Sequence, residues 1–244
     1  MAEQALALLA NEVHVWTAWL GAGTALDADA LLTLSTGEVD RANRFHREED
    51  RDHFVQRRIL LREIIGAYSH TAPGDLEFTT NRHGCPAVVF PVTAATISFS
   101  SSHSDALAVI AIARGQTLGV DVERIHGQSL EEIAEVTARF FTARESAAIA
   151  HLGAAERARA FFATWARKEA ITKALGRGLS IPLNAFDVSV TPGEGGAILR
   201  WDAEWERMGD LRLHELALAD GYAACLAVEH RAMVRLRGDW LRAR

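Results

Sequence analysis

The sequence predicts an α+β protein built from two lobes of similar size. Alternating apolar segments that favour strands occur in both halves of the chain, and each half also contains one long segment with helical spacing. Its 244 residues suffice for one large domain or two modest ones, and we place the boundary between residues 1–115 and 116–244. Hydrophobic residues make up 49% and charged residues 24%, which is typical of a globular protein.

In the first half, residues 13–20 alternate and are rich in strand formers, so we expect a strand there. Residues 36–68 predict helix, in two pieces, because four apolar side chains lie along one helical stripe. The stripe consists of Phe54, Leu61, Ile65 and Tyr68. Short strands are expected at 76–80, 97–99 and 106–113, with a turn at 83–86.

In the second half, residues 118–123 alternate with period two, which puts Gly119, Asp121 and Glu123 on one face of a strand. Thr142-Ala-Arg-Glu145 matches a capping box and predicts the start of a helix. A longer helix is expected over 155–175, followed by Gly176 as its stop. The other expected elements are a helix near 130–136 and strands at 186–190, 197–201, 211–218 and 222–228.

Composition and charge exclude several classes of protein. No apolar run approaches the ~18 residues that span a bilayer, and residues 1–5 lack the basic region of a secretory signal, so we expect no membrane association. Cys85 and Cys225 lie far apart without a CxxC pair, which argues against a disulfide framework and favours the cytoplasm. The net charge of −6 argues against nucleic acid but allows a local arginine cluster to bind an anionic small molecule.

A pair of carboxylates in the strand at 118–123 suggests a cation site. Side chains two apart on a strand lie roughly 6–7 Å from each other on the same face, so Asp121 and Glu123 repel. A divalent cation would relieve that repulsion, and oxygen ligands favour Mg²⁺. Alternatively, the two carboxylates form the solvated face of an edge strand.

Three further groups of residues could carry chemistry. Trp165, Glu169 and Lys173 share one helical face, and the tryptophan indicates partial burial, although Glu–Lys pairs at this spacing are also common on surfaces. The segment 102–104, Ser-His-Ser after a strand, could bind phosphate or could be a polar turn. Seven arginines between residues 41 and 62 are balanced by acidic residues, so only one or two could be ligand contacts.

Taken together, these motifs resemble the 4′-phosphopantetheinyl transferase superfamily. Gly119-Val-Asp121-Val-Glu123 is followed by Trp165-Ala-Arg-Lys-Glu169-Ala-Ile-Thr-Lys173, at the spacing of the surfactin-synthetase type. Ser-His-Ser at 102–104, Arg-Phe at 44–45 and Gly-Arg-Gly-Leu at 176–179 add to the resemblance, which spans residues 38–190. It implies a monomer of two pseudo-symmetric lobes, each a small antiparallel sheet packed with a long helix.

The resemblance also implies an activity, that of a holo-acyl-carrier-protein synthase. Such an enzyme transfers 4′-phosphopantetheine from coenzyme A to a serine of an apo acyl or peptidyl carrier protein, and 3′,5′-ADP leaves. The carrier protein would serve fatty acid, polyketide or nonribosomal peptide biosynthesis. Coenzyme A would bind between the lobes, the first of which contributes most of its contacts, and the second lobe would hold the metal and meet the carrier protein.

Residue by residue, the resemblance assigns the following roles. Mg²⁺, or Mn²⁺ in its place, would be held by Asp121, Glu123 and Glu169, and the catalytic residues would be Glu169, Lys173 and Asp121. Glu169 would accept the serine proton directly or through a water, with a metal-bound hydroxide as the rival base. The residues expected to contact coenzyme A are Arg41, Arg82, Pro86, Ser102, His103 and Lys173.

The sequence departs from the family pattern at Gly84-Cys85-Pro86, where the family has a lysine between glycine and proline. One phosphate contact is therefore missing or supplied by another residue, for which we name Arg82. At Ser100 the family has an asparagine. For the acidic carrier protein we name four arginines of the second half by charge alone: Arg139, Arg144, Arg167 and Arg177.

Two other functions fit the same residues. One is a different Mg²⁺-dependent enzyme that cleaves phosphodiesters, and Mg²⁺-assisted binding of coenzyme A would separate it from a transferase. The other is a non-catalytic relative that binds carrier proteins or nucleotides. The presence of Asp121, Glu123, Glu169 and Lys173 together argues against that relative.

Overall fold

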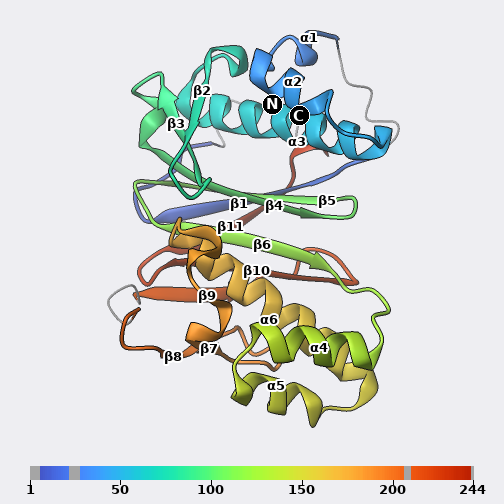
Figure 1. Cartoon of the computed structure of the whole chain (residues 1–244). Coiled ribbons are helices and arrows are strands. Elements are labelled where there is room, and N and C mark those ends of the chain that lie inside the picture. The colour runs from blue at the N-terminus through green and yellow to red at the C-terminus, as the bar shows by residue number, and fades with distance from the viewer. Residues whose placement is uncertain (1–5, 22–27, 206–209, 243–244) are drawn as a thin grey trace.

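Two β-sheets face each other at the centre of the molecule, and each sheet carries a long helix on its outer face (Figure 1). The structure is a computed structural model, which describes residues 6–21, 28–205 and 210–242. The layers follow the order helix, sheet, sheet, helix. The predicted α+β fold with two lobes is confirmed.

The first sheet has the strand order β11-β1-β5-β4. Its strands are β1 (Glu12–Trp19), β4 (Ile97–Ser104), β5 (Leu107–Arg114) and β11 (Met233–Asp239). Three of them pair antiparallel, but β11 runs parallel to β1. The last strand of the chain therefore returns to the first sheet, although its residue numbers lie in the predicted second lobe of 116–244.

Helices cover the outer face of the first sheet. They are α1 (Ala28–Leu31), α2 (Thr36–Ala42) and α3 (Glu48–Ser69), and a hairpin of β2 (Glu77–Thr80) and β3 (Pro86–Phe90) lies beside them. The prediction of helix in two pieces over 36–68 is confirmed by α2 and α3. The apolar stripe of α3, including Leu61, Ile65 and Tyr68, is buried against the sheet.

The second sheet has the strand order β6-β10-β9. Its strands are β6 (Leu118–Arg124), β9 (Leu211–Glu215) and β10 (Tyr222–Glu229), and β7 (Phe186–Val188) pairs with β8 (Ile198–Trp201) beside it. The helices are α4 (Leu130–Phe140), α5 (Ala143–Ala150) and α6 (Ala154–Ala174). Thr142 and Glu145 form the predicted capping box at the start of α5.

An apolar core joins the two sheets. Val120 and Val122 of β6 pack there with Val109 and Ala111 of β5, and all four are buried. The opposite face of β6, which carries Gly119, Asp121 and Glu123, is thereby turned toward α6 and away from that core. The predicted division of β6 into two faces is confirmed.

Gly119 allows α6 to lie directly on β6. A Cβ atom at this position would lie 2.2 Å from the Ala170 carbonyl oxygen and 2.2 Å from the Ala174 nitrogen, far inside van der Waals contact. Only glycine leaves room for the helix backbone here. This close approach sets α6 beside the two carboxylates of β6. In the described part of the chain, no helix is both long and apolar enough to cross a membrane.

Candidate active site

Three segments that are far apart in the chain meet where β4, β6 and α6 come together. Lys173 of α6 donates to the Asp121 carboxylate of β6, with 2.6 Å between Nζ and Oδ1, and to Ser102 Oγ of β4 at 2.9 Å. Ser102 in turn donates to Asp121 Oδ1 at 2.8 Å. The structure thus brings together one residue from each of three predicted motifs.

Asp121 is the most deeply buried acid of this group, with 3% of its surface exposed. Burial raises the pKa of its carboxyl, against the opposing effects of the Lys173 ammonium and the hydrogen bond from Ser102. The second oxygen, Oδ2, is buried and accepts no hydrogen bond. A buried carboxylate oxygen without a partner is costly, so this atom is suited to bind a cation.

Glu123 and Glu169 add negative charge on the same side of β6. Burial, and then the neighbouring Asp121, raise the pKa of Glu123 to about 7, with a smaller contribution from Glu169. The same two causes, in the same order, raise the pKa of Glu169. The three carboxyls are therefore close enough for their charges to interact, and the repulsion expected from the strand spacing of Asp121 and Glu123 is present.

The predicted set of metal ligands fits a hard divalent cation by its chemistry. It offers three carboxylates in mutual repulsion and the unpartnered Oδ2 of Asp121. Oxygen donors of this kind suit Mg²⁺ or Mn²⁺. Over residues 6–21, 28–205 and 210–242, however, no three acidic, histidine or cysteine side chains lie close enough together to ligate one ion. The assignment of Asp121, Glu123 and Glu169 to a metal stays a prediction.

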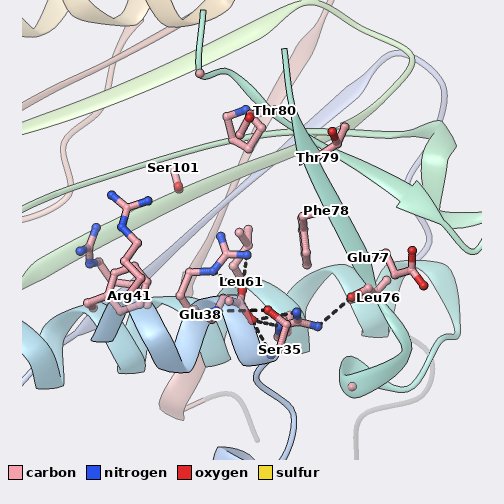
Figure 2. A pocket seen from close by; sticks show the side chains of 18 residues that line it. Ser35, Glu38, Arg41, Leu61, Leu76, Glu77, Phe78, Thr79, Thr80 and Ser101 are labelled. Atoms are coloured by element: carbon pink, nitrogen blue, oxygen red, sulfur yellow. Dashed lines mark hydrogen bonds and ion pairs between the residues drawn. The ribbon is translucent and has the colours of Figure 1, made fainter. Parts of the chain in front are cut away.

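A basic cleft of about 830 Å³ opens between α3 and the β2–β3 hairpin. Its volume is within the range of small-molecule sites. Figure 2 shows Arg41 and Glu38 on its helical side and Phe78, Thr79 and Thr80 along the facing strand. The predicted ligand contacts Arg41 and Pro86 both line it, together with Arg57, Arg58 and Ser101.

Arg57 lies in the most crowded part of this positive field. Burial, followed by the charges of Arg41 and Arg58, lowers the pKa of its guanidinium to about 10. Repulsion between guanidinium groups is relieved when an anion binds among them, and their planar donors match phosphate oxygens. The cleft is therefore suited to a phosphorylated ligand.

His103 lies between the basic cleft, where it contacts Arg57, and Lys173, whose charge acts on it. Its Nδ1 lies 3.1 Å from the Arg57 Nη1, and since arginine only donates, Nδ1 must accept. Partial burial first, and then the Arg57 charge, lower the pKa of His103 to about 4. His103 is thus neutral at pH 7, and its Nε2 carries the proton and can donate to a ligand.

Glu38 binds two further arginines of α3. It pairs with Arg58 and, at 2.8 Å, with Arg62, which is only 2% exposed. Arg62 also donates to the carbonyl oxygens of Pro73 and Leu76 at 2.8 and 2.9 Å. Arg62 is therefore a structural residue of the cleft wall, whereas Arg41 and Arg57 present charge to the cleft.

The turn between β2 and β3 carries the departure from the family pattern. Arg82 Nε donates to His83 at 2.9 Å, and Arg82 is not among the described residues that line the cleft. Cys85 lies against Gly176, in the loop after α6. A Cβ atom added to Gly176 would be 3.5 Å from the Cys85 Sγ. The sequence analysis named Arg82 as a phosphate contact, whereas the arginine that lines the cleft is Arg57. The sequence feature that could have indicated Arg57 is its position three residues after Phe54, beside the apolar stripe of the helix.

Two cations of the α6 motif are structural. Lys168 is fully buried, pairs with Glu145 at 2.9 Å and donates to the carbonyl oxygens of Leu183 and Phe186, both at 2.7 Å. Arg167 is 1% exposed and donates to the carbonyl oxygens of Ser189 and Thr191. The suggestion that Arg167 meets a carrier protein is therefore wrong, because its guanidinium is used inside the lobe.

Comparisons with known proteins agree with this geometry. A model of the 4′-phosphopantetheinyl transferase superfamily matches residues 117–227, and a model of the N-terminal part of 4′-phosphopantetheinyl transferases matches residues 21–114. The chain is 34% identical to the 4′-phosphopantetheinyl transferase HetI of Nostoc sp. over 224 residues, which cover 91% of this chain and 90% of that protein.

Two further relatives carry the same activity in their names. A phosphopantetheinyl transferase of Thraustochytrium sp. is 31% identical over 82% of this chain and 71% of its own length. The 4′-phosphopantetheinyl transferase Sfp of Bacillus subtilis is 28% identical over 64% of this chain and 66% of its own length. The two matched family segments meet at residues 114–117, between β5 and β6.

Proposed function

The chain belongs to the 4′-phosphopantetheinyl transferase superfamily, and we propose that it transfers 4′-phosphopantetheine from coenzyme A to a serine hydroxyl of an acyl or peptidyl carrier protein. One observation carries this proposal. The hydrogen-bonded group of Ser102, Asp121 and Lys173 lies at the junction of the lobes. His103, the next residue of β4, contacts Arg57 of the basic cleft and lies within range of the Lys173 charge. A donor with several phosphates can therefore lie across both sites.

Coenzyme A would place its phosphates along the basic side of this groove. Arg41 and Arg57 supply charge, Pro86 lines the cleft, and neutral His103 donates from Nε2. Lys173 can turn from Asp121 to a phosphate oxygen, because its side chain is partly exposed. Since Cys85 has replaced the family lysine, we assign that missing phosphate contact to Arg57.

Asp121, Glu123 and Glu169 would hold Mg²⁺ on the acidic side. When bound, the ion would neutralise charge on the pyrophosphate and on the leaving group. Burial first, and then the charge of Asp121, raise the pKa of Glu123 and of Glu169, and a bound cation would offset both effects. The role of the chain is to keep the three acidic groups together by burial and by the close contact of α6 with β6.

Transfer requires one proton to leave the serine hydroxyl and one P–O bond to form as another breaks. Glu169 would take the proton of the carrier serine, directly or through a water. The serine oxygen attacks the β-phosphorus of coenzyme A, forming a new P–O bond. The P–O bond to the adenosine portion breaks, and 3′,5′-ADP leaves with the bonding electron pair.

The carrier protein, which is acidic around its serine in this family, would approach the second lobe. Exposed arginines on that side are Arg139 on α4 and Arg144 on α5, and Arg177 follows α6. We further propose that the chain acts as a monomer, as the family resemblance implies, and in the cytoplasm, which its two cysteines without a CxxC pair favour.

Mass spectrometry of carrier proteins tests the proposal. The protein is incubated with coenzyme A, Mg²⁺ and a panel of apo carrier proteins, and a carrier should gain the mass of one phosphopantetheine group. Glu169→Gln and Asp121→Asn should each lower the rate by roughly 10²-fold or more, which is the usual scale of losing a catalytic acid or base. Glu156→Gln, an exposed acid at the start of the same helix, is the matched control and should keep the rate.

Two outcomes would contradict the proposal. Transfer that persists in both folded variants would exclude the carboxylates from the reaction. Cleavage of coenzyme A without any carrier modification would instead indicate an enzyme that hydrolyses phosphodiesters.

A further inference from the structure

Strand β4 presents two different faces to the two lobes. Phe99 packs in the core of the first lobe, Ser101 lines the basic cleft, and His103 contacts Arg57. The alternate residues face the second sheet, because their partners on β5 belong to the core between the sheets. These alternate residues are Ser98, Ser100, Ser102 and Ser104.

Two of these serines bind the backbone of β6 with their side chains. Ser100 Oγ accepts the Val120 N–H and Ser104 Oγ accepts the Arg124 N–H, both at 3.0 Å. Strands β4 and β6 belong to different sheets, so these bonds use side chains where neighbouring strands of one sheet would use backbone carbonyls. Both pairs are twenty residues apart in sequence, which fixes a single register between the two strands.

The same row of hydroxyls binds the carboxylates of β6. Ser102 donates to Asp121 Oδ1 at 2.8 Å, and Ser104 donates to Glu123 Oε2 at 3.2 Å. A hydroxyl has one donor and two acceptor positions, so Ser104 can hold the Arg124 N–H and the Glu123 carboxylate at once. Ser104 thereby ties the orientation of Glu123 to the register of the two lobes.

We propose that Ser104 is a positioning residue that orients the Glu123 carboxylate into the cation site. Through their hydrogen bonds to β6, Ser100, Ser102 and Ser104 together fix how the two lobes are aligned at that site. The proposal rests on the proposed function, in which Glu123 binds a divalent cation. Hydrogen bonds to ligating carboxylates fix their orientation, and losing one typically weakens metal binding about 10–100-fold. Without Ser104, Glu123 is free to rotate about its own side-chain bonds.

Binding of Mn²⁺ alone, measured by electron paramagnetic resonance on the full chain, tests the role of Ser104 without any turnover. Ser104→Ala should weaken Mn²⁺ binding about tenfold and raise the Mg²⁺ concentration for half-maximal transfer by a similar factor. Its KM for coenzyme A and its melting temperature should stay close to those of Ser98→Ala. Ser98 is the matched control, since it lies on the same face of the same strand but away from the carboxylates.

Ser104→Thr separates positioning from a general structural role. It keeps the hydroxyl on a strand, where threonine is well tolerated, so Mn²⁺ affinity should return to within a few-fold of the original. Wild-type Mn²⁺ affinity in Ser104→Ala overturns the proposal. So does an equal loss of metal binding and melting temperature that Ser104→Thr does not restore.

The proposed function itself fails if no carrier protein gains phosphopantetheine, whatever the metal measurements give. The cation site fails in a different way. If the unaltered protein transfers phosphopantetheine but binds no Mn²⁺, or if Asp121→Asn binds Mn²⁺ as well as the unaltered protein, the cation site itself is wrong. If metal binding depends on Asp121 but not on Ser104, the cation site stands and only the positioning role is overturned.

Discussion

The two lobes solve the same packing problem with different residues. In the first lobe, Glu38 caps α2 and pairs with buried Arg62, which also binds two backbone carbonyls. In the second lobe, Glu145 caps α5 and pairs with buried Lys168, which likewise binds two backbone carbonyls. In each lobe, one buried cation of the long helix therefore pairs with a glutamate that caps a shorter helix and donates to two carbonyl oxygens of a nearby segment.

The lobes differ in what they present to the groove. Five residues before Arg62, Arg57 joins Arg41 and Arg58 in the basic cleft. Five residues after Lys168, Lys173 joins Asp121 beside an acidic cluster. The charge pairs that the lobes share therefore hold each lobe together. The charges that differ would, in the proposed function, bind phosphate in the first lobe and a cation in the second.

Removal of the buried cations should have the largest effect on stability. Lys168→Met leaves buried Glu145 and two carbonyl oxygens without their cation. Arg62→Met breaks one of the two ion pairs of Glu38, which keeps Arg58, and leaves two carbonyl oxygens without a donor. Because each change breaks a buried ion pair, each should lower the free energy of unfolding by about 3–5 kcal/mol. Urea unfolding followed by circular dichroism would measure both. Arg47→Met, an exposed arginine at the start of α3, should change stability by less than about 0.5 kcal/mol. A small loss in only one of the two core variants would break the parallel between the lobes.

Gly119→Ala should have a somewhat smaller effect on stability and a direct effect on the site. The added methyl must push α6 away from β6, and overpacking of this kind costs about 1–3 kcal/mol. Because the shift separates Lys173 from Asp121, transfer should also fall at least tenfold, as measured by carrier modification. Gly127→Ala is the control, since its Cβ would meet nothing within 4 Å. Full activity in Gly119→Ala would show that close contact of α6 is not needed at the site.

Arg57→Ala tests the anion-binding side with the smallest expected effect. The KM for coenzyme A should rise about tenfold, or about 1.4 kcal/mol, while kcat changes little. Adding Cys85→Lys in the same chain restores the family lysine to the turn that lines the cleft, and should recover most of the lost affinity. Cys85→Lys alone should lower the KM for coenzyme A by less than it does in the Arg57→Ala background. If it lowers the KM by the same factor in both backgrounds, then Arg57 does not replace that lysine.

Local patterns in the sequence predicted most of the elements. The period-two face of β6, the capping box at Thr142 and the two-piece helix over 36–68 all depend on residues close together in the chain, and each was found as expected. Strand β11 was missed, although the alternation in Met233-Val-Arg-Leu-Arg is a local signal of a strand, and its partner β1 lies more than two hundred residues earlier. Pairing at that distance leaves no local signal.

The sequence by itself determined the acidic pair on β6, the Glu–Lys helix and, through the resemblance, the family. Only the tertiary structure decided which charged side chains stabilise the fold and which face the candidate site. Lys168 and Lys173 are neighbours on one helix, yet one is enclosed among carbonyls and the other faces Asp121. Burial and the identity of the neighbours set the role of an ionised side chain, and both are properties of how distant segments pack rather than of the residues beside it in the chain.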